Sequence, residues 1–153
     1  MKILNSIKIK NVQFKNRVVM APMLNFAVPI STDGIMSQKL MDYYFQRAIS
    51  GIGLMICQNL SVTSKMRLHG GLGAYSNEHI EYIKKLAEEC NNHNTKFFAQ
   101  LAYPSTGYQN GDSINNLTQK SIEEIKDEFV RAAKICKKAG CDGIELHGAH
   151  GFF

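Results

Sequence analysis

The stretch from residue 139 to residue 151 combines a helix end, a short strand and two histidines. It reads Ala139-Gly140-Cys141-Asp142-Gly143-Ile144-Glu145-Leu146-His147-Gly148-Ala149-His150-Gly151. Ala139-Gly140 is typical of a helix C-terminus, because glycine readily takes the left-handed backbone that closes a helix. Gly143-Ile144-Glu145-Leu146 is the strand that we expect to follow. His147 and His150 therefore come directly after a strand end.

Three earlier runs of apolar residues are also short enough to be strands buried on both faces. Ahead of them, the segment from Ile7 to Phe14 alternates apolar and polar residues around Lys10-Asn11, which predicts a small hairpin. The three runs are Val18-Val19-Met20-Ala21, Leu54-Met55-Ile56-Cys57 and Phe97-Phe98-Ala99-Gln100-Leu101.

Amphipathic helices are expected between these strands, because apolar residues recur there at helical spacing. Ser37 and Ser76 are the expected N-caps of the first two helices. Ser121 and Glu124 fit a capping box that opens the third helix, with Ile122 on its inward face. The expected helices cover residues 37–50, 77–90 and 121–138.

The alternation of buried strands and amphipathic helices predicts an α/β fold with a parallel sheet and right-handed crossovers. Two architectures share this order of elements, the doubly wound open sheet and the (β/α)8 barrel. No G-x-G-x-x-G sequence follows the first strand, which weakens the dinucleotide-binding version of the open sheet. Periodicity alone leaves both architectures open.

The composition excludes several classes of function. The net charge is +5, but the basic residues are scattered among acidic ones, so we expect no nucleic-acid partner. No stretch approaches the roughly 18 apolar residues of a membrane span, so no membrane partner is expected. The four cysteines have no C-x-x-C spacing, which indicates reduced thiols and a cytoplasmic protein.

Four motifs, in the same order along the chain, resemble the Old Yellow Enzyme family of NADH:flavin oxidoreductases and NADH oxidases. This resemblance implies the N-terminal half of a (β/α)8 TIM barrel, with strands 1–4 preceded by a short hairpin. Residues 1–153 would then form one partial FMN-binding domain whose C-terminal half is absent. The motifs are Asn16-Arg17-Val18-Val19-Met20-Ala21-Pro22-Met23, then Tyr43-Tyr44-Phe45-Gln46-Arg47-Ala48 with Gly51-Ile52-Gly53-Leu54-Met55-Ile56, Gln100-Leu101, and residues 139–151.

The resemblance also implies the cofactor and the residues that contact it. FMN would take electrons from NADH or NADPH and pass hydride to an electron-poor alkene or another small-molecule acceptor. Gln100 would hydrogen-bond the pyrimidine edge of the flavin, since its amide offers both a donor and an acceptor. The full set of implied cofactor-binding residues is Ala21, Pro22, Met23, Leu24, Asn59 and Gln100.

His147 and His150 are the implied catalytic residues. They lie three residues apart after a strand end, where barrel enzymes build their active sites. Two imidazole donors there would hold a carbonyl or nitro oxygen of the acceptor and activate the adjoining double bond. No metal site is expected, because a third ligand and the H-E-x-x-H pattern are missing. Glu145 could face the barrel interior, but it is a weak candidate for a catalytic base.

Three positions depart from the family pattern. Phe152 stands where relatives usually have a tyrosine that protonates the acceptor, and phenylalanine has no proton to give. Leu24 stands where relatives often place Thr or Cys against the flavin. The segment after Gln100-Leu101, from Ala102 to Thr106, lacks the usual His and Gly-Arg. These departures put the proton donor and the flavin environment in question.

A second hypothesis is a non-catalytic half-barrel. Four strands leave two sheet edges with unpaired backbone groups, so such a fragment would need a partner or would self-associate as a homo-oligomer. An unrelated barrel enzyme, such as a phosphate-ester lyase, would require a lysine or paired carboxylates at the strand ends. The sequence shows neither.

Overall fold

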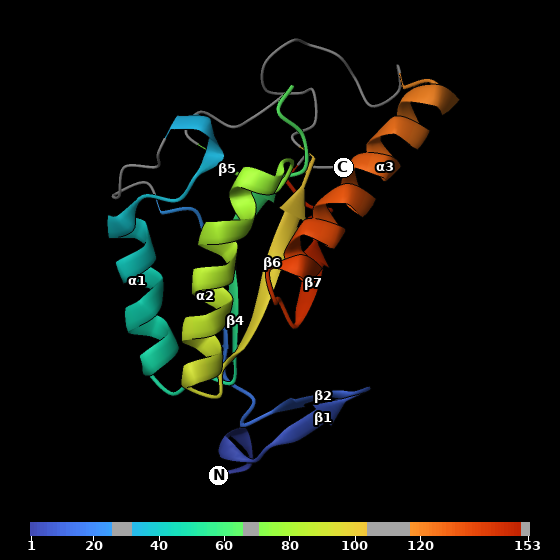
Figure 1. Ribbon diagram of the computed structural model, residues 1–153. Helices are drawn as coiled ribbons and strands as arrows, with labels where there is room; N and C mark the ends of the chain where they lie inside the picture. The colour runs from blue at the N-terminus through green and yellow to red at the C-terminus, as the bar shows by residue number, and fades with distance from the viewer. Residues whose placement is uncertain (26–31, 66–70, 104–116, 151–153) are drawn as a thin grey trace.

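The computed structural model describes residues 1–25, 32–65, 71–103 and 117–150. A hairpin of β1 (Ile7–Ile9) and β2 (Val12–Phe14) precedes a separate sheet (Figure 1). The strands of that sheet are β3 (Val19–Met20), β4 (Leu54–Ser61), β5 (Leu72–Gly73), β6 (Lys96–Ala102) and β7 (Gly143–Leu146). The helices are α1 (Gln38–Ile49), α2 (Ile80–Asn92) and α3 (Gln119–Lys138), with 3-10 turns at Lys2–Leu4, Thr32–Gly34 and Asn77–His79.

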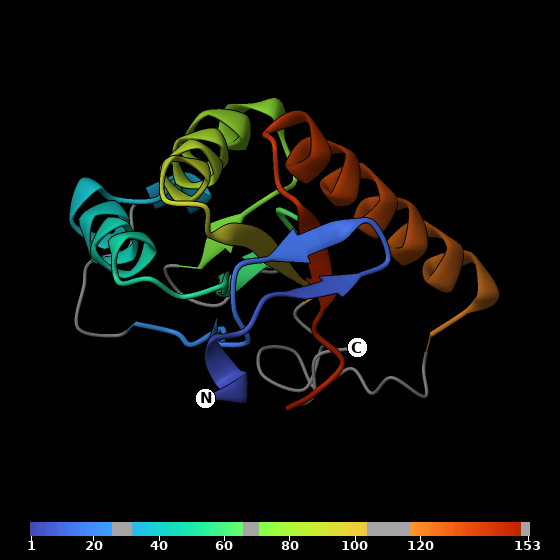
Figure 2. The same ribbon diagram turned by 90° about the horizontal axis from the view of Figure 1, so that it is seen from below.

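The sheet is parallel and its strand order follows the chain, β3-β4-β6-β7, with β5 added beside β4. All three helices lie along one face of it, as the view from below shows (Figure 2). A doubly wound sheet has helices on both faces and reverses its strand order at a switch point. Neither feature occurs in the described residues, so the arrangement is that of a barrel wall. The prediction of an α/β fold with a parallel sheet is confirmed.

The core lies between the sheet and the helices. In β6, Phe97, Ala99 and Leu101 point under the helices and are fully buried, while Phe98 and Gln100 point to the opposite, inner face. Burial of large side chains on the helix-covered face supplies most of the apolar stabilisation. The largest of them are Leu40, Tyr44, Met55, Leu60, Ile83, Leu86, Phe97 and Leu101.

The hairpin lies at the amino end of the sheet (Figure 2). Its turn is at Lys10, where φ is 51°, as expected from the sequence. Phe14 contacts Phe98 edge-on, with 6.2 Å between ring centroids. This contact covers the amino end of the inner face, whereas no such contact lies at the carboxyl ends of the described strands.

The two ends of the sheet are more exposed than the sequence predicts. Val19 of β3 is 50% exposed, and Ile144 and Leu146 of β7 are 37% and 65% exposed. The expectation of buried strands is therefore wrong for β3 and β7. Among the described residues, each has a paired strand on one side only, so fewer side chains cover it. No helix of the described residues is long and apolar enough to cross a membrane.

Helix α3 begins earlier than predicted. Its N-cap is Thr118, whose hydroxyl accepts a hydrogen bond from the Ser121 backbone N–H at 3.1 Å. The predicted capping box at Ser121 and Glu124 is wrong, because Thr118 offers the same cap one turn earlier. Ile122 is 39% exposed rather than inward. The N-cap at Ser37 is confirmed, with its hydroxyl accepting from Leu40 N at 3.3 Å.

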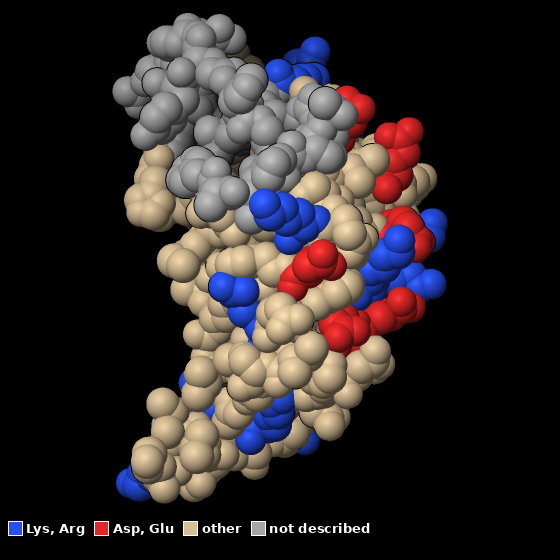
Figure 3. Space-filling view, turned by 90° about the vertical axis from the view of Figure 1, so that its left-hand side faces the viewer, with Lys and Arg blue, Asp and Glu red and all other residues tan. Residues whose placement is uncertain are grey.

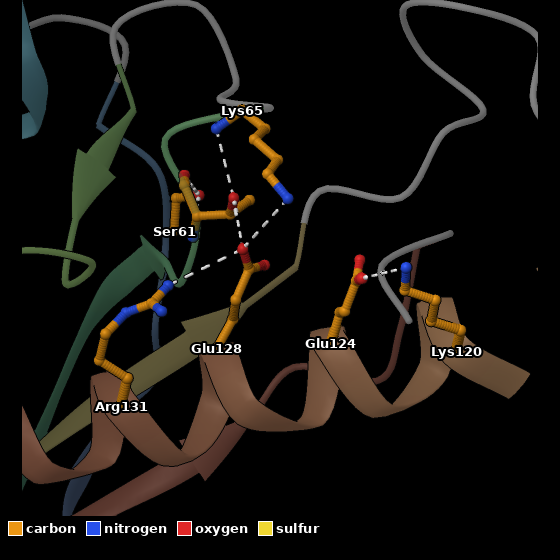
Figure 4. A network of polar contacts seen from close by, with 7 residues as sticks. Ser61, Lys65, Lys120, Glu124, Glu128 and Arg131 are labelled. Atoms are coloured by element: carbon orange, nitrogen blue, oxygen red, sulfur yellow. Dashed lines mark hydrogen bonds and ion pairs between the residues drawn. The ribbon is translucent and has the colours of Figure 1, made fainter.

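A polar network joins the middle of α3 to the segment after β4 (Figure 4). The Glu128 carboxylate accepts a hydrogen bond from the Thr63 hydroxyl at 3.2 Å. Lys65 and Arg131 lie 3.9 Å and 3.8 Å from the same oxygen. The Glu128 side chain is 12% exposed, so this carboxylate is better shielded from solvent than its partners Lys65 and Arg131, which are 71% and 50% exposed. On the face in Figure 3, acidic and basic side chains are interspersed.

The position of the α3 cap can be tested by substitution. Thr118→Ala should lower the free energy of unfolding by about 1 kcal/mol, because the Ser121 N–H loses its acceptor at the helix start. Ser121→Ala is the matched control and should change it by no more than about 0.5 kcal/mol. Urea denaturation followed by circular dichroism measures both. A larger loss of unfolding free energy in Ser121→Ala than in Thr118→Ala would instead support the capping box at Ser121 and Glu124.

Candidate functional site

A pocket of about 710 Å³ opens at the carboxyl ends of the strands. Its volume is in the range of small-molecule sites, and its place is where barrel enzymes carry their active sites. Two segments contribute most of the wall, the one that follows β3 and the one formed by the end of β7 and the residues after it. The lining residues are Pro22, Met23, Leu24, Asn59, Gln100, Glu145, Leu146, His147, Gly148, Ala149 and His150.

The structure brings together seven of the eight residues that the sequence predicts for the site. Ala21 is the exception: it is exposed and does not line the pocket. Glu145 also lines the pocket, although by sequence it is a weak candidate for a functional residue. The signal that could have found it is strand alternation, because Glu145 lies two residues before His147 and so shares its face.

Asn59 reaches the pocket because β4 contains a bulge. The register pairs Cys57 with Ala99 and Leu60 with Leu101, so Gln58 and Asn59 together oppose the single residue Gln100. The bulge turns Asn59 to the inner face, where it is 9% exposed and lies at the pocket wall.

The bulge is anchored from the helix side. The backbone N–H of Gln58 donates to the Tyr44 hydroxyl of α1 at 2.9 Å, so the group that the bulge frees still has an acceptor. The Gln58 side chain is fully buried, and its carbonyl oxygen accepts from Asn25 N at 3.4 Å. Helix α1 thus holds the strand segment that presents Asn59.

Gln100 is oriented by Glu145. The two residues are register partners on β6 and β7, and Gln100 Nε2 donates to Glu145 Oε1 at 2.7 Å. Gln100 is 7% exposed. Its amide oxygen and its second N–H stay available to a ligand in the pocket.

The two histidines lie face to edge at the mouth of the pocket, with 5.6 Å between ring centroids and 75° between ring planes. The His147 backbone N–H donates to Leu101 O at 2.9 Å, which continues the pairing with β6 beyond β7. His150 has φ of 57°, a left-handed conformation that is uncommon for residues other than glycine. This backbone conformation places the His150 imidazole next to that of His147.

The pKa of His147 lies below its ordinary value. Partial burial is the main cause, because it disfavours the charged imidazolium, and the neighbouring His150 adds repulsion. The Glu145 carboxylate acts in the opposite direction. The neutral imidazole of His147 is therefore favoured more than that of an ordinary histidine.

Two of the expected features lie outside the described residues, Phe152 and the segment 104–106. Within the described ranges, no three histidine, cysteine, aspartate or glutamate side chains gather closely enough to hold a metal ion.

The sequence pattern of the NADH:flavin oxidoreductase / NADH oxidase family matches residues 2–116 and 104–153 of this chain. The chain belongs to this family. The resemblance to Old Yellow Enzymes is thereby confirmed. The two matched segments overlap between residues 104 and 116, next to the predicted departure from the family pattern after Gln100-Leu101.

Members of the family in several bacteria are similar to this chain along nearly all of its length. A NADPH dehydrogenase of Listeria monocytogenes serotype 4b is 34% identical over 167 aligned positions, which cover 99% of this chain and 49% of that protein. A NADPH dehydrogenase of Clostridium acetobutylicum is 32% identical, with the same coverage. The chain thus spans about half the length of the curated relatives it matches.

Solved structures of the family have the same fold. Old Yellow Enzyme from a Pichia species superposes with a TM-score of 0.85 at 26% identity, covering 99% of this chain and 47% of that one. An Old Yellow Enzyme homologue from Zymomonas mobilis, at 22% identity and a TM-score of 0.83, shows the same fold over 50% of its chain. The described sheet is therefore half of a TIM barrel, as predicted.

The anchor of the bulge gives a stability prediction. Tyr44→Phe should lower the free energy of unfolding by about 1–3 kcal/mol, because the buried Gln58 N–H loses its acceptor. Tyr43→Phe, next to it on α1 with its ring packed against Arg47, should change it by no more than about 0.5 kcal/mol. Urea denaturation of both variants checks this. Equal effects of the two variants would mean that the hydroxyl does not hold the bulge.

The environment of His147 gives a pH prediction. Its NMR titration midpoint should lie below the ordinary value of 6.5, so that it is protonated only in more acidic solution. His150→Gln should raise the midpoint by removing the repulsion, and Glu145→Gln should lower it by removing the attraction. Midpoint shifts in the same direction for both variants would contradict this account of the site.

Proposed function

We propose that this chain forms the first half of the active site of an FMN-dependent NADPH oxidoreductase of the Old Yellow Enzyme type. The observation that carries the proposal is the single pocket in which the segment Pro22–Leu24, two amides and two histidines converge. The acceptor is an electron-poor alkene or another small molecule with a carbonyl or nitro oxygen. The names of the similar bacterial proteins favour NADPH over NADH as the donor.

The pocket residues fit a flavin. The Gln100 amide keeps one acceptor and one donor free, and the pyrimidine edge of a flavin alternates carbonyls with an N–H. Pro22, Met23 and Leu24 offer an apolar wall for the planar ring. When bound, FMN supplies the hydride that passes to the acceptor. Leu24 cannot form a hydrogen bond with its side chain, so that side chain affects the flavin only through packing.

The two histidines bind the acceptor in this proposal. Their ring N–H groups donate to the acceptor oxygen and draw electron density from the adjoining double bond. The lowered pKa of His147 keeps that residue a neutral donor near pH 7. Phe152 has no proton to give, so solvent water is the proposed source of the proton that completes reduction of an alkene.

A second candidate, a non-catalytic half-barrel that needs a partner or self-association to fold, is supported by the open side of β7. A groove of about 460 Å³ lies between α3 and β7, and its walls are mainly apolar side chains. The exposed edge and the groove offer a place for further strands and helices, from the same polypeptide, a partner or a second copy. The groove is lined by Ile122, Ile125, Lys126, Phe129, Leu146, His147 and Gly148.

The cytoplasm is the proposed compartment. All four cysteines are free, three of them buried, and burial raises the pKa of the Cys90 thiol to about 12. Such thiols remain protonated and react slowly with oxidants.

The experiment that tests the proposal is an FMN titration of the purified chain, followed by quenching of flavin fluorescence, with size-exclusion chromatography of the same sample. Saturable binding is expected, and Gln100→Ala should raise the dissociation constant about tenfold by removing two hydrogen bonds to the ring. Gln38→Ala, an exposed glutamine on α1, is the matched control and should leave it unchanged.

Flavin binding and the oligomeric state together separate the two candidate functions. Saturable binding by a monomer or dimer with the expected Gln100 effect supports the oxidoreductase, and NADPH oxidation can then be assayed. Free flavin together with aggregation would refute a flavin site in the isolated chain and favour the half-barrel that requires another half.

A further inference from the structure

We propose that Glu145 is a positioning residue, which fixes the orientation of the Gln100 amide so that the amide can recognise the pyrimidine edge of the flavin. The inference rests on the proposed function and adds to it a residue with a defined task. It starts from the hydrogen bond between Gln100 Nε2 and Glu145 Oε1, which is 2.7 Å long and partly buried.

The register between β6 and β7 is fixed at both ends of this pair. Before it, the Asp142 carboxylate accepts from Lys96 Nζ at 2.7 Å and from Phe97 N at 3.0 Å. After it, His147 N donates to Leu101 O at 2.9 Å. These contacts lie before and after Glu145 along the chain, so they keep it paired with its register partner Gln100.

Gly143 adds a steric constraint on the same face. A Cβ atom at this position would lie 2.6 Å from Cζ of Phe98, so the Phe98 ring covers the glycine directly. Phe98 and Gln100 are two residues apart and share the inner face of β6. A side chain at position 143 would displace the Phe98 ring, so glycine there allows the register in which Glu145 lies opposite Gln100.

A carboxylate beside a terminal amide determines which of its two orientations the amide adopts. An amide can turn by 180° and exchange its oxygen and nitrogen at almost no cost in volume, but a carboxylate only accepts hydrogen bonds. Glu145 therefore selects the orientation with Nε2 toward β7. The amide oxygen then points to the other side, ready to accept from the flavin N3–H, and the second Nε2–H can donate to an adjacent carbonyl.

The flavin analogue methylated at N3 tests this orientation directly, because it lacks the N–H that the amide oxygen would accept. The wild-type chain should bind FMN about tenfold more tightly than 3-methyl-FMN. Glu145→Met removes the acceptor at similar length and should abolish this preference while weakening FMN binding about tenfold. Glu145→Gln, which can still accept through Oε1, should retain part of the preference.

A double-mutant cycle separates positioning from a merely structural role. If Glu145 acts through Gln100, then Glu145→Met should not weaken FMN binding further in a Gln100→Ala background. Additive losses in the double variant would overturn the proposal. Thermal unfolding of each variant shows whether it is folded before titration.

An NMR measurement without flavin keeps the proposal falsifiable if a variant binds no ligand. In the wild-type chain, one of the two Gln100 Nε2 protons should be shifted downfield and protected from exchange, and Glu145→Met should abolish both effects. Two equivalent, rapidly exchanging protons in the wild-type chain would overturn the proposal. Failure of the wild-type chain to bind FMN would instead refute the proposed function, whereas equal FMN affinities of wild type and Glu145→Met refute the positioning role alone.

Discussion

The register of the parallel pairing between β4 and β6 determines which side chains lie on each face of the sheet. On the helix side, it aligns Met55 and Cys57 with Phe97 and Ala99, and these buried side chains form the floor on which α1 and α2 pack. On the inner side, the same pairing contains the bulge that sets Asn59 beside Gln100. A shift of one residue would exchange the two faces, burying amides under the helices and exposing apolar groups to the pocket. The core and the site therefore depend on one register.

The sequence predicts the elements of the fold well where their pattern is periodic and local. The hairpin around Lys10, the caps at Ser37 and the alternation of strands and helices all follow from residues near one another in the chain. The length of β4 does not, because the apolar run stops at Cys57 while the strand continues to Ser61. Gln58 and Asn59 are polar and resemble a loop in the sequence, and the acceptor for the Gln58 backbone N–H, the Tyr44 hydroxyl, comes from a distant helix.

The candidate site also has a part that the sequence predicts and a part that it does not. Its residues were predicted because parallel strands end together and because each motif resembles a family pattern. The role of Glu145 could not be predicted in this way. Its contact with Gln100 depends on the register between β6 and β7, which is fixed by Asp142 and by the absence of a side chain at Gly143. These contacts join residues about 45 positions apart, and no short motif encodes them.

The exposed edge of β7 also has a consequence for the order in which the chain folds. Along the path β3-β4-β6-β7 each strand pairs with the one before it, so each of these pairings can form as soon as one more strand and helix have been synthesised. Contacts of this kind are established early during translation, before distant segments exist. The edge of β7, where Ile144 and Leu146 are exposed, is then an edge with which a later strand can pair without disturbing the strands that have already folded.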